Sequence, residues 1–335
     1  MKSFIKALSY YLPETILTNK DLLKDFPEWS VEKVAEKIGI SKRHIASDNE
    51  TSCDLAVEAG KKLFVEYKID PGNIDFIILC TQSPDYFLPT TACIVQDRLG
   101  IPVSAGALDI NLGCSGFVYG LALAKGLIRS ETAKNVLLIT AETYSKYIHP
   151  RDKSNRTIFG DAAAAALVSD NGFAEILNFS FGTDGSGAEK LIVRTGGMRV
   201  PEKKNDLYYD DSGNPISSDH LFMDGTEIFN FTLEMVPELV RDTLSKNSLT
   251  LADIDLFVFH QANKYMLEFL RKKIRIHEKK FYYFLETVGN TVSSTIPIAL
   301  YEARKERKIK SGYNVLIAGF GVGYSWGATI LKINK

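Results

Sequence analysis

Residues 108–129 read Leu-Asp-Ile-Asn-Leu-Gly-Cys-Ser-Gly-Phe-Val-Tyr-Gly-Leu-Ala-Leu-Ala-Lys-Gly-Leu-Ile-Arg. The apolar run at 107–112 predicts the end of a buried strand, and the Ala- and Gly-rich run from Gly116 predicts a buried helix. Cys114 then lies at a strand-to-helix turn, where free N–H groups and the helix dipole favour a thiolate and an adjacent oxyanion. The flanking glycines would let a substrate carbonyl approach. Cys114 is therefore a candidate nucleophile, although most free cysteines are small core residues.

The composition is that of an ordinary globular protein. The chain has 335 residues, of which 45% are hydrophobic and 24% charged, enough for about two domains. A formal charge of −1 gives no overall attraction to nucleic acid or to an anionic membrane, so we expect neither partner. No apolar run approaches the roughly 18 residues of a membrane span, and the N-terminus lacks the apolar core of a signal peptide. We therefore expect a cytoplasmic protein.

The four cysteines do not indicate a metal site or a disulfide framework. They stand at positions 53, 80, 93 and 114, without a C-x-x-C pair and without nearby histidines at ligand spacing. We expect reduced thiols and no bound metal.

Two pairs of similar short segments indicate an internal repeat. Residues 73–78 (Asn-Ile-Asp-Phe-Ile-Ile) resemble residues 253–258 (Asp-Ile-Asp-Leu-Phe-Val), at an offset of 180. Residues 134–139 (Lys-Asn-Val-Leu-Leu-Ile) resemble residues 313–318 (Tyr-Asn-Val-Leu-Ile-Ala), at an offset of 179. Two matches at nearly one offset predict a duplicated unit of helices and buried strands, and hence a layered α/β architecture with a mixed or parallel sheet.

The duplication would bring candidate groups together. We place the two halves at residues 1–170 and 171–335. Adding the repeat offset of 180 to the last residue of the buried strand at 74–80 gives His260, which also follows a buried strand. If a pseudo-twofold axis relates the halves, their loops meet at the centre, and Cys114, His260 and Asn290 share one site.

These three residue types suit thiol acyl transfer. Taken singly, a histidine after a strand is more often a core residue, and an asparagine beside glycine is first a turn signal. Together, the Cys114 thiolate would attack a thioester, while two neutral donors, the His260 Nε2–H and the Asn290 amide, would stabilise an enolate oxygen. The glycine-rich segment 319–327 lacks the Lys-Ser/Thr of a phosphate loop, and we expect the Gly323 N–H to face an oxyanion.

Other elements follow from periodicity and turn signals. Residues 201–220 are polar and rich in turn formers, which predicts an excursion near the site or at a subunit interface. Helices are predicted over 51–67, 90–99, 114–130 and 226–245, and strands over 2–9, 74–80, 106–111, 136–140 and 162–168.

Motifs along nearly the whole chain resemble the β-ketoacyl-acyl carrier protein synthase III family of the thiolase superfamily. They are Tyr11-Leu12-Pro13-Glu14, Gly39-Ile40 with Arg43-His44-Ile45-Ala46, the Asp109-to-Gly116 turn, Phe159-Gly160-Asp161, His260-Gln261-Ala262-Asn263, Gly289-Asn290-Thr291 and Gly323-Tyr324-Ser325-Trp326-Gly327. The resemblance implies a thiolase-like five-layered αβαβα fold made of two duplicated halves, and a homodimer.

The same resemblance implies a reaction. Cys114 would take an acyl group from acyl-CoA, and His260 and Asn290 would stabilise the enolate formed as malonyl-acyl carrier protein loses carbon dioxide. The enolate carbon would then attack the acyl-enzyme, a decarboxylative Claisen condensation that initiates fatty acid biosynthesis. The amides of Cys114 and Gly323 would form the oxyanion hole. No cofactor is implied, since acyl-CoA and malonyl-acyl carrier protein are the substrates.

Three further contacts come from the resemblance. Trp29 would stack on the CoA adenine, with Lys153 as the cationic partner. Lys272 and Lys273 match a lysine pair that meets the acidic carrier protein, although a solvated helix face is the simpler interpretation of a charge run.

Phe87 or Leu88 would cap the acyl pocket of the neighbouring subunit and influence the length of the chain accepted. Some positions depart from the family pattern: Tyr265 replaces an arginine, and residues 162–165 are all alanine where glycines alternate. Two alternatives therefore stay open. One is an acyltransferase or specialised-metabolite condensing paralogue on the same fold, and the other is a non-catalytic partner subunit.

Overall fold

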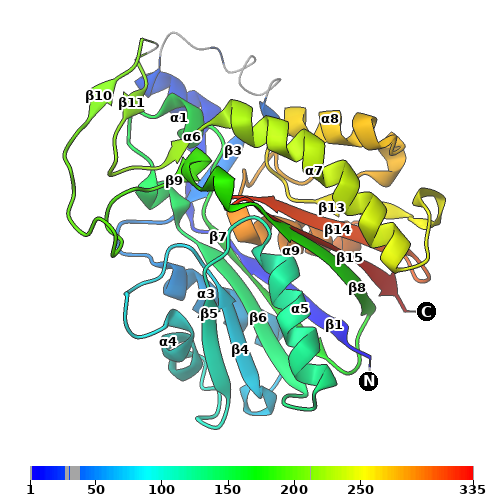
Figure 1. The fold of residues 1–335 in the computed structure, drawn as a ribbon. Helices are drawn as coiled ribbons and strands as arrows, with labels where there is room; N and C mark the ends of the chain where they lie inside the picture. The colour runs from blue at the N-terminus through cyan, green and yellow to red at the C-terminus, as the bar shows by residue number, and fades with distance from the viewer. Residues whose placement is uncertain (1, 27–29, 31–37, 212, 335) are drawn as a thin grey trace.

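The computed structural model describes residues 2–26, 30, 38–211 and 213–334 (Figure 1). Within these residues the largest sheet has nine strands in the order β13-β14-β15-β8-β1-β7-β6-β4-β5. The strands span Phe4–Tyr11 (β1), Phe76–Cys80 (β4), Gly106–Ile110 (β5), Asn135–Glu142 (β6), Ala162–Ser169 (β7), Ala174–Thr183 (β8), Leu256–Phe259 (β13), Asn314–Gly321 (β14) and Ser325–Ile333 (β15). Three two-stranded sheets pair Thr15–Thr18 (β2) with Lys42–Ile45 (β3), Leu191–Ile192 (β9) with Phe222–Met223 (β12), and Tyr208–Tyr209 (β10) with Pro215–Ile216 (β11).

Helices cover both faces of the strands and fill the space between them (Figure 1). They span Asn19–Asp25 (α1), Ser52–Tyr67 (α3), Thr91–Arg98 (α4), Gly116–Arg129 (α5), Lys153–Arg156 (α6), Gly225–Lys246 (α7), Lys264–Ile274 (α8) and Thr295–Lys305 (α9). Helices α5 and α9 each contact strands of both parts of the sheet, whereas α3 and α4 cover one outer face and α7 and α8 the other. The result is the predicted five-layered αβαβα arrangement.

The two parts of the sheet repeat one topology. In β4-β6-β7-β1 and in β13-β14-β15-β8, the first pair is parallel and the next two pairs are antiparallel. The two parts join where β1 meets β8, with Phe4 opposite Glu175. This repeated strand order agrees with the duplication that the two pairs of similar segments predict.

Small side chains let helices approach β7 from both sides. The alternation of a strand puts Ala162 and Ala164 against Ile298 of α9, and Ala163 and Ala165 into the core formed with α3. The run of alanines, which departs from the family pattern, therefore still leaves the room that helix packing needs. Strand β7 follows directly on the Phe159-Gly160-Asp161 motif, so this packing also fixes one wall of the site.

The predicted elements lie within a few residues of those observed. Helix α3 begins where predicted because Thr51 caps it, accepting from the Asp54 N–H while the Asp54 carboxylate accepts from the Thr51 N–H. The segment 201–220, predicted only as a turn-rich excursion, contains the β10–β11 hairpin. In the described part of the chain no helix is long and apolar enough to cross a membrane.

Candidate active site

Cys114 lies in the turn between β5 and α5 and is 6% exposed. Strand β14 passes directly over this turn. A Cβ at Gly319 would lie 2.6 Å from the Cys114 carbonyl oxygen, and a Cβ at Gly321 would lie 2.8 Å from Cys114 Sγ. Both distances are too short for a side chain, so β14 can pack against this turn only because glycine stands at both positions.

The glycines that flank the cysteine leave room for neighbouring protein side chains. A Cβ at Gly113 would lie 2.6 Å from Gln82 Oε1, and a Cβ at Gly116 would meet the Cys80 sulfur. That they also let a substrate carbonyl approach stays a prediction.

In the folded protein, burial outweighs the local features that favour a thiolate at Cys114. Burial and the nearby Glu142 carboxyl raise the pKa of Cys114 to about 12, although the amides of Cys114 and Val322 oppose this rise. Burial likewise raises the pKa of Glu142 to about 8. Since desolvation outweighs the favourable amides, Cys114 is a thiol at neutral pH, and its attack on a substrate needs a proton acceptor.

His260 is neutral and so has a ring nitrogen that can take a proton transiently, although the burial that keeps it neutral also makes it a weak base. It follows β13 and is 2% exposed, and burial lowers its pKa to about 3. Its Nδ1 lies 2.8 Å from Thr295 Oγ1, and the Thr295 hydroxyl donates to the Val292 carbonyl at 3.1 Å. The Thr295 hydroxyl can donate to either of these two acceptors, so the contact accommodates both neutral tautomers of His260: with the proton on Nδ1 the Nε2 atom accepts, and with the proton on Nε2 that atom donates.

The backbone beside β7 holds Asn290. The Asn290 N–H donates to the Ile158 carbonyl at 2.9 Å, and its carbonyl accepts from the Gly160 N–H at 3.0 Å. The side-chain Oδ1 accepts from the Val292 N–H at 2.9 Å. This contact fixes the orientation of the amide, so the Asn290 NH₂ is the group left to serve as a donor.

Val292 links the two donors, and sequence reasoning missed both it and Thr295. The Val292 N–H binds Asn290, and its carbonyl accepts from the hydroxyl that contacts His260. Val292 has φ +53° and is 1% exposed, a conformation that a β-branched residue rarely adopts and that marks a constrained site. The one available signal was that a buried neutral histidine needs a partner for Nδ1.

Cys114, His260 and Asn290 line one cavity of about 140 Å³. The structure thus brings together the three residues that the repeat predicted would meet. The other lining residues are Ile158, Phe159, Leu191, Met223, Gly225, Ile228, Thr232, Ala262, Asn263, Met266, Phe320 and Gly321. Most of these are apolar, which suits an acyl chain. Gly323 is not among them, and its predicted oxyanion role stays a prediction.

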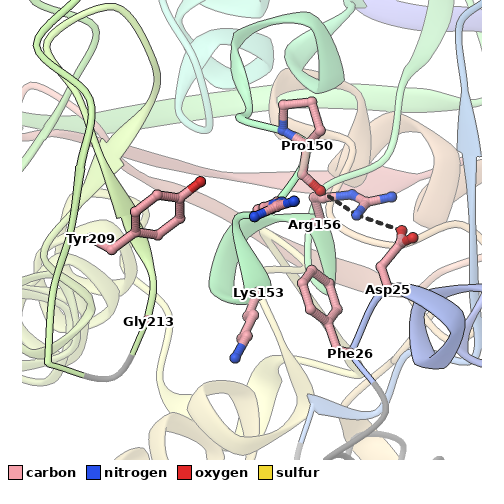
Figure 2. Close-up of a pocket in the computed structure, with 8 residues that line it drawn as sticks. Asp25, Phe26, Pro150, Lys153, Arg156, Tyr209 and Gly213 are labelled. Carbon is pink, nitrogen blue, oxygen red and sulfur yellow. Dashed lines mark hydrogen bonds and ion pairs between the residues drawn. The ribbon is translucent and has the colours of Figure 1, made fainter.

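A second cavity, of about 630 Å³, lies where α6 faces the β10–β11 hairpin (Figure 2). Lys153 lines it, with Nζ 5.8 Å from the centroid of the Phe26 ring. Arg156 also lines it and pairs with Asp25 at 2.9 Å. Trp29, predicted to stack on adenine, lies outside the described residues.

The remaining predicted residues lie on the surface. Lys272 and Lys273 are exposed on the last turn of α8, whose first turn follows Asn263 of the catalytic cavity. Phe87 and Leu88 are 77% and 87% exposed in the loop between β4 and α4. Among the described residues, no cluster of three or more His, Cys, Asp or Glu side chains could hold a metal ion.

Known proteins match this chain over almost its whole length. Residues 108–185 match the 3-oxoacyl-[acyl-carrier-protein (ACP)] synthase III family, and residues 244–333 match its C-terminal region. A beta-ketoacyl-[acyl-carrier-protein] synthase III of Clostridium perfringens is 39% identical over 324 residues, which cover 96% of this chain and 97% of the relative. The chain belongs to the 3-oxoacyl-[acyl-carrier-protein] synthase III family.

The solved structures agree with this membership. A crystal structure of a 3-oxoacyl-(acyl-carrier-protein) synthase III is 48% identical, covers 99% of this chain and 100% of its own, and has a TM-score of 0.97. One from Burkholderia xenovorans LB400 is 36% identical, covers 100% and 95%, and has a TM-score of 0.91. The predicted thiolase-like fold is confirmed. So is the predicted function of a beta-ketoacyl-ACP synthase III, an acyl-transferring condensing enzyme that initiates fatty acid synthesis.

Proposed function

We propose that this synthase condenses an acyl-CoA starter with malonyl-acyl carrier protein through an acyl group held on Cys114. The observation that carries the proposal is that Cys114, His260 and Asn290 line one buried, largely apolar cavity. The complete set of reactive groups argues against a non-catalytic partner subunit.

In the first half-reaction, Cys114 Sγ forms a bond to the thioester carbonyl carbon and the bond from that carbon to the CoA sulfur breaks. The Cys114 proton passes to His260 Nε2 and then to the departing CoA sulfur, so the histidine ends neutral. The oxyanion would be bound by the amides of Cys114 and Gly323, as the sequence predicts, while the Cys114 and Val322 amides contact the Cys114 sulfur.

In the second half-reaction, malonyl-acyl carrier protein loses carbon dioxide and leaves an enolate. The Asn290 NH₂ and the His260 Nε2–H donate to the enolate oxygen. The enolate carbon forms a bond to the acyl carbon, the bond from that carbon to Cys114 Sγ breaks, and the product is a 3-oxoacyl-carrier protein. The departing Cys114 thiolate takes up one proton from solvent, which restores the thiol. Here the Thr295 hydroxyl donates to His260 Nδ1 instead of to Val292, since Nε2 must carry the proton.

Two surfaces would receive the substrates. The cavity beside Lys153 would hold the CoA nucleotide, with Trp29 as the stacking residue. Lys272 and Lys273 would meet acidic side chains of the carrier protein, because a local basic patch can steer an acidic partner even when net charge is near zero. The reaction requires no cofactor.

We also propose a cytoplasmic homodimer in which Phe87 or Leu88 reaches the acyl pocket of the partner. Their exposure, together with that of Tyr86 at 62%, forms an apolar patch that a second copy would cover. Within each subunit we assign the duplicated halves to residues 1–170 and 171–335, which the repeated strand order supports.

Mass spectrometry of the intact protein tests the central proposal. After exposure to acyl-CoAs of different chain length and branching, the protein should gain the mass of one acyl group, and the preferred donor identifies the starter. Cys114→Ala should remain unmodified. Acylation of that variant would refute the assignment of the nucleophile.

A further inference from the structure

The β10–β11 hairpin forms one wall of the second cavity. Tyr209 and Gly213 of the hairpin line it together with Lys153 and Arg156 of α6. In Figure 2 the Tyr209 side chain points into the cavity from the side opposite to Phe26 and Asp25. A ligand in this cavity would therefore contact the hairpin.

Side-chain carboxylates fold this segment back on itself. Asp219 accepts from the Lys204 and Asn205 N–H groups, each at 2.8 Å, and Asp206 accepts from the Ser218 N–H at 2.9 Å. Such charge-assisted bonds to backbone N–H groups are stronger than neutral ones, so they hold the position of the hairpin. Tyr209 therefore projects from a segment that these hydrogen bonds hold in place.

The cavity combines positive charge with aromatic rings. Arg151, Lys153 and Arg156 line it, and of the described lining residues Asp25 carries the carboxylate, which pairs with Arg156. Basic side chains suit phosphate groups, and a flat ring can stack on an aromatic side chain. Both features match a phosphorylated nucleotide.

We propose that Tyr209 contacts the nucleotide end of the acyl-CoA donor and makes the enzyme prefer nucleotide-bearing donors over thioesters that lack the nucleotide. The inference rests on the proposed acyl transfer from CoA to Cys114 and adds a specificity-determining residue to it. Tyr209 lines the second cavity and not the one that holds Cys114, so its contribution is to binding of the donor.

The neighbouring Tyr208 supplies a matched control. Successive residues of a strand point to opposite faces, and Tyr208, which is 58% exposed, does not line the cavity. Tyr208→Ala removes the same ring from the same hairpin without removing the proposed contact.

The test compares two donors that carry the same acyl group, acyl-CoA and the acyl-pantetheine thioester. Acylation of Cys114 is followed by intact-mass spectrometry. We expect Tyr209→Ala to raise the KM for acyl-CoA about tenfold with kcat retained, since stacking on a base is worth roughly 1–3 kcal/mol. The acyl-pantetheine constants should match those of the wild type, and Tyr209→Phe should behave as wild type with both donors if the ring makes the contact.

Each outcome decides the inference. An unchanged KM for acyl-CoA in Tyr209→Ala, an equal loss with both donors, or an equal effect of Tyr208→Ala would overturn it. If the wild type is acylated by neither donor, the proposed function itself fails, and the inference fails with it. If the wild type is acylated by both donors with the same KM, only the inference about the nucleotide is refuted.

Discussion

Asn290 Oδ1 accepts a hydrogen bond from the Val292 N–H at 2.9 Å. The bond joins two residues of one short turn, in which Val292 has φ +53°. It leaves the NH₂ end of the Asn290 amide free, so we predict that this residue acts on the substrate as a donor. The carbonyl of the same Val292 accepts from Thr295, which contacts His260 Nδ1, so Val292 lies between the two groups predicted to bind the enolate.

Asn290→Asp tests whether the Asn290 side chain acts as a hydrogen-bond donor, because it keeps the position of the side chain and removes the NH₂ group. The aspartate can keep the bond to the Val292 N–H but replaces the NH₂ donor with an oxygen. We expect acylation of Cys114 to persist while decarboxylation of malonyl-acyl carrier protein falls by about 10²–10³, the usual cost of one oxyanion donor. Release of carbon dioxide measures this, with intact mass reporting acylation. Normal decarboxylation by both Asn290→Asp and Asn290→Ala would show that the amide does not bind the enolate.

Thr295→Val removes the hydroxyl partner of His260 Nδ1 with little change of volume. We expect condensation to fall at least about tenfold, because the imidazole loses the group that sets its tautomer. Thr295→Ser keeps the hydroxyl and should restore most of the rate. A structural role alone would lower the melting temperature without this rescue, so thermal unfolding is measured beside the rate.

His260 should show no ionisation in the neutral range. Burial lowers its pKa to about 3, so the imidazole is neutral around pH 7. The unfolded chain takes up this proton below about pH 6.5. The free energy of unfolding should therefore fall as pH falls from about 6.5 toward 3, and His260→Gln should flatten that part of the curve.

Glu142 should act on stability in the opposite direction. Its carboxyl is fully buried and has a pKa of about 8, so the folded state keeps a proton that the unfolded chain has lost above about pH 4.5. Stability should fall as pH rises from about 4.5 to 8, and Glu142→Gln should remove that slope.

The same substitution tests the influence of Glu142 on the nucleophile. Because the carboxylate helps to raise the pKa of Cys114, the neutral glutamine should let alkylation by iodoacetamide begin at lower pH. Cys114→Ala gives the background from the other thiols. Identical pH profiles for wild type and Glu142→Gln would show that burial alone sets this pKa.

Phe87→Glu tests the proposed subunit contact. The side chain is 77% exposed in the single chain, so the charge should leave the fold intact. We expect it to shift the sedimentation coefficient from dimer to monomer, because a charge in an apolar interface is costly to desolvate. Val65→Glu, on an equally exposed residue of α3 at 81%, is the matched control and should leave the assembly unchanged.

The sequence by itself determined the layered architecture and predicted three residues that line one cavity. Continuous apolar runs such as 76–80 and 136–140 predict buried strands because both faces of such a strand need apolar side chains. The two pairs of similar segments, at nearly the same offset, predicted the duplication. The duplication in turn predicted that Cys114, His260 and Asn290 lie in one site. These are local or periodic properties, so they can be read along the chain.

Only the tertiary structure decided the ionisation of the site and the partners of its donors. Burial makes Cys114 a thiol, although the local turn favours a thiolate, because desolvation depends on every element packed around the sulfur. The roles of Gly319, Gly321 and Thr295 depend on contacts between segments far apart in the chain. The hairpin that carries Tyr209 also depends on tertiary structure. Composition predicts its turns, but the cavity that it lines exists only where the hairpin meets α6.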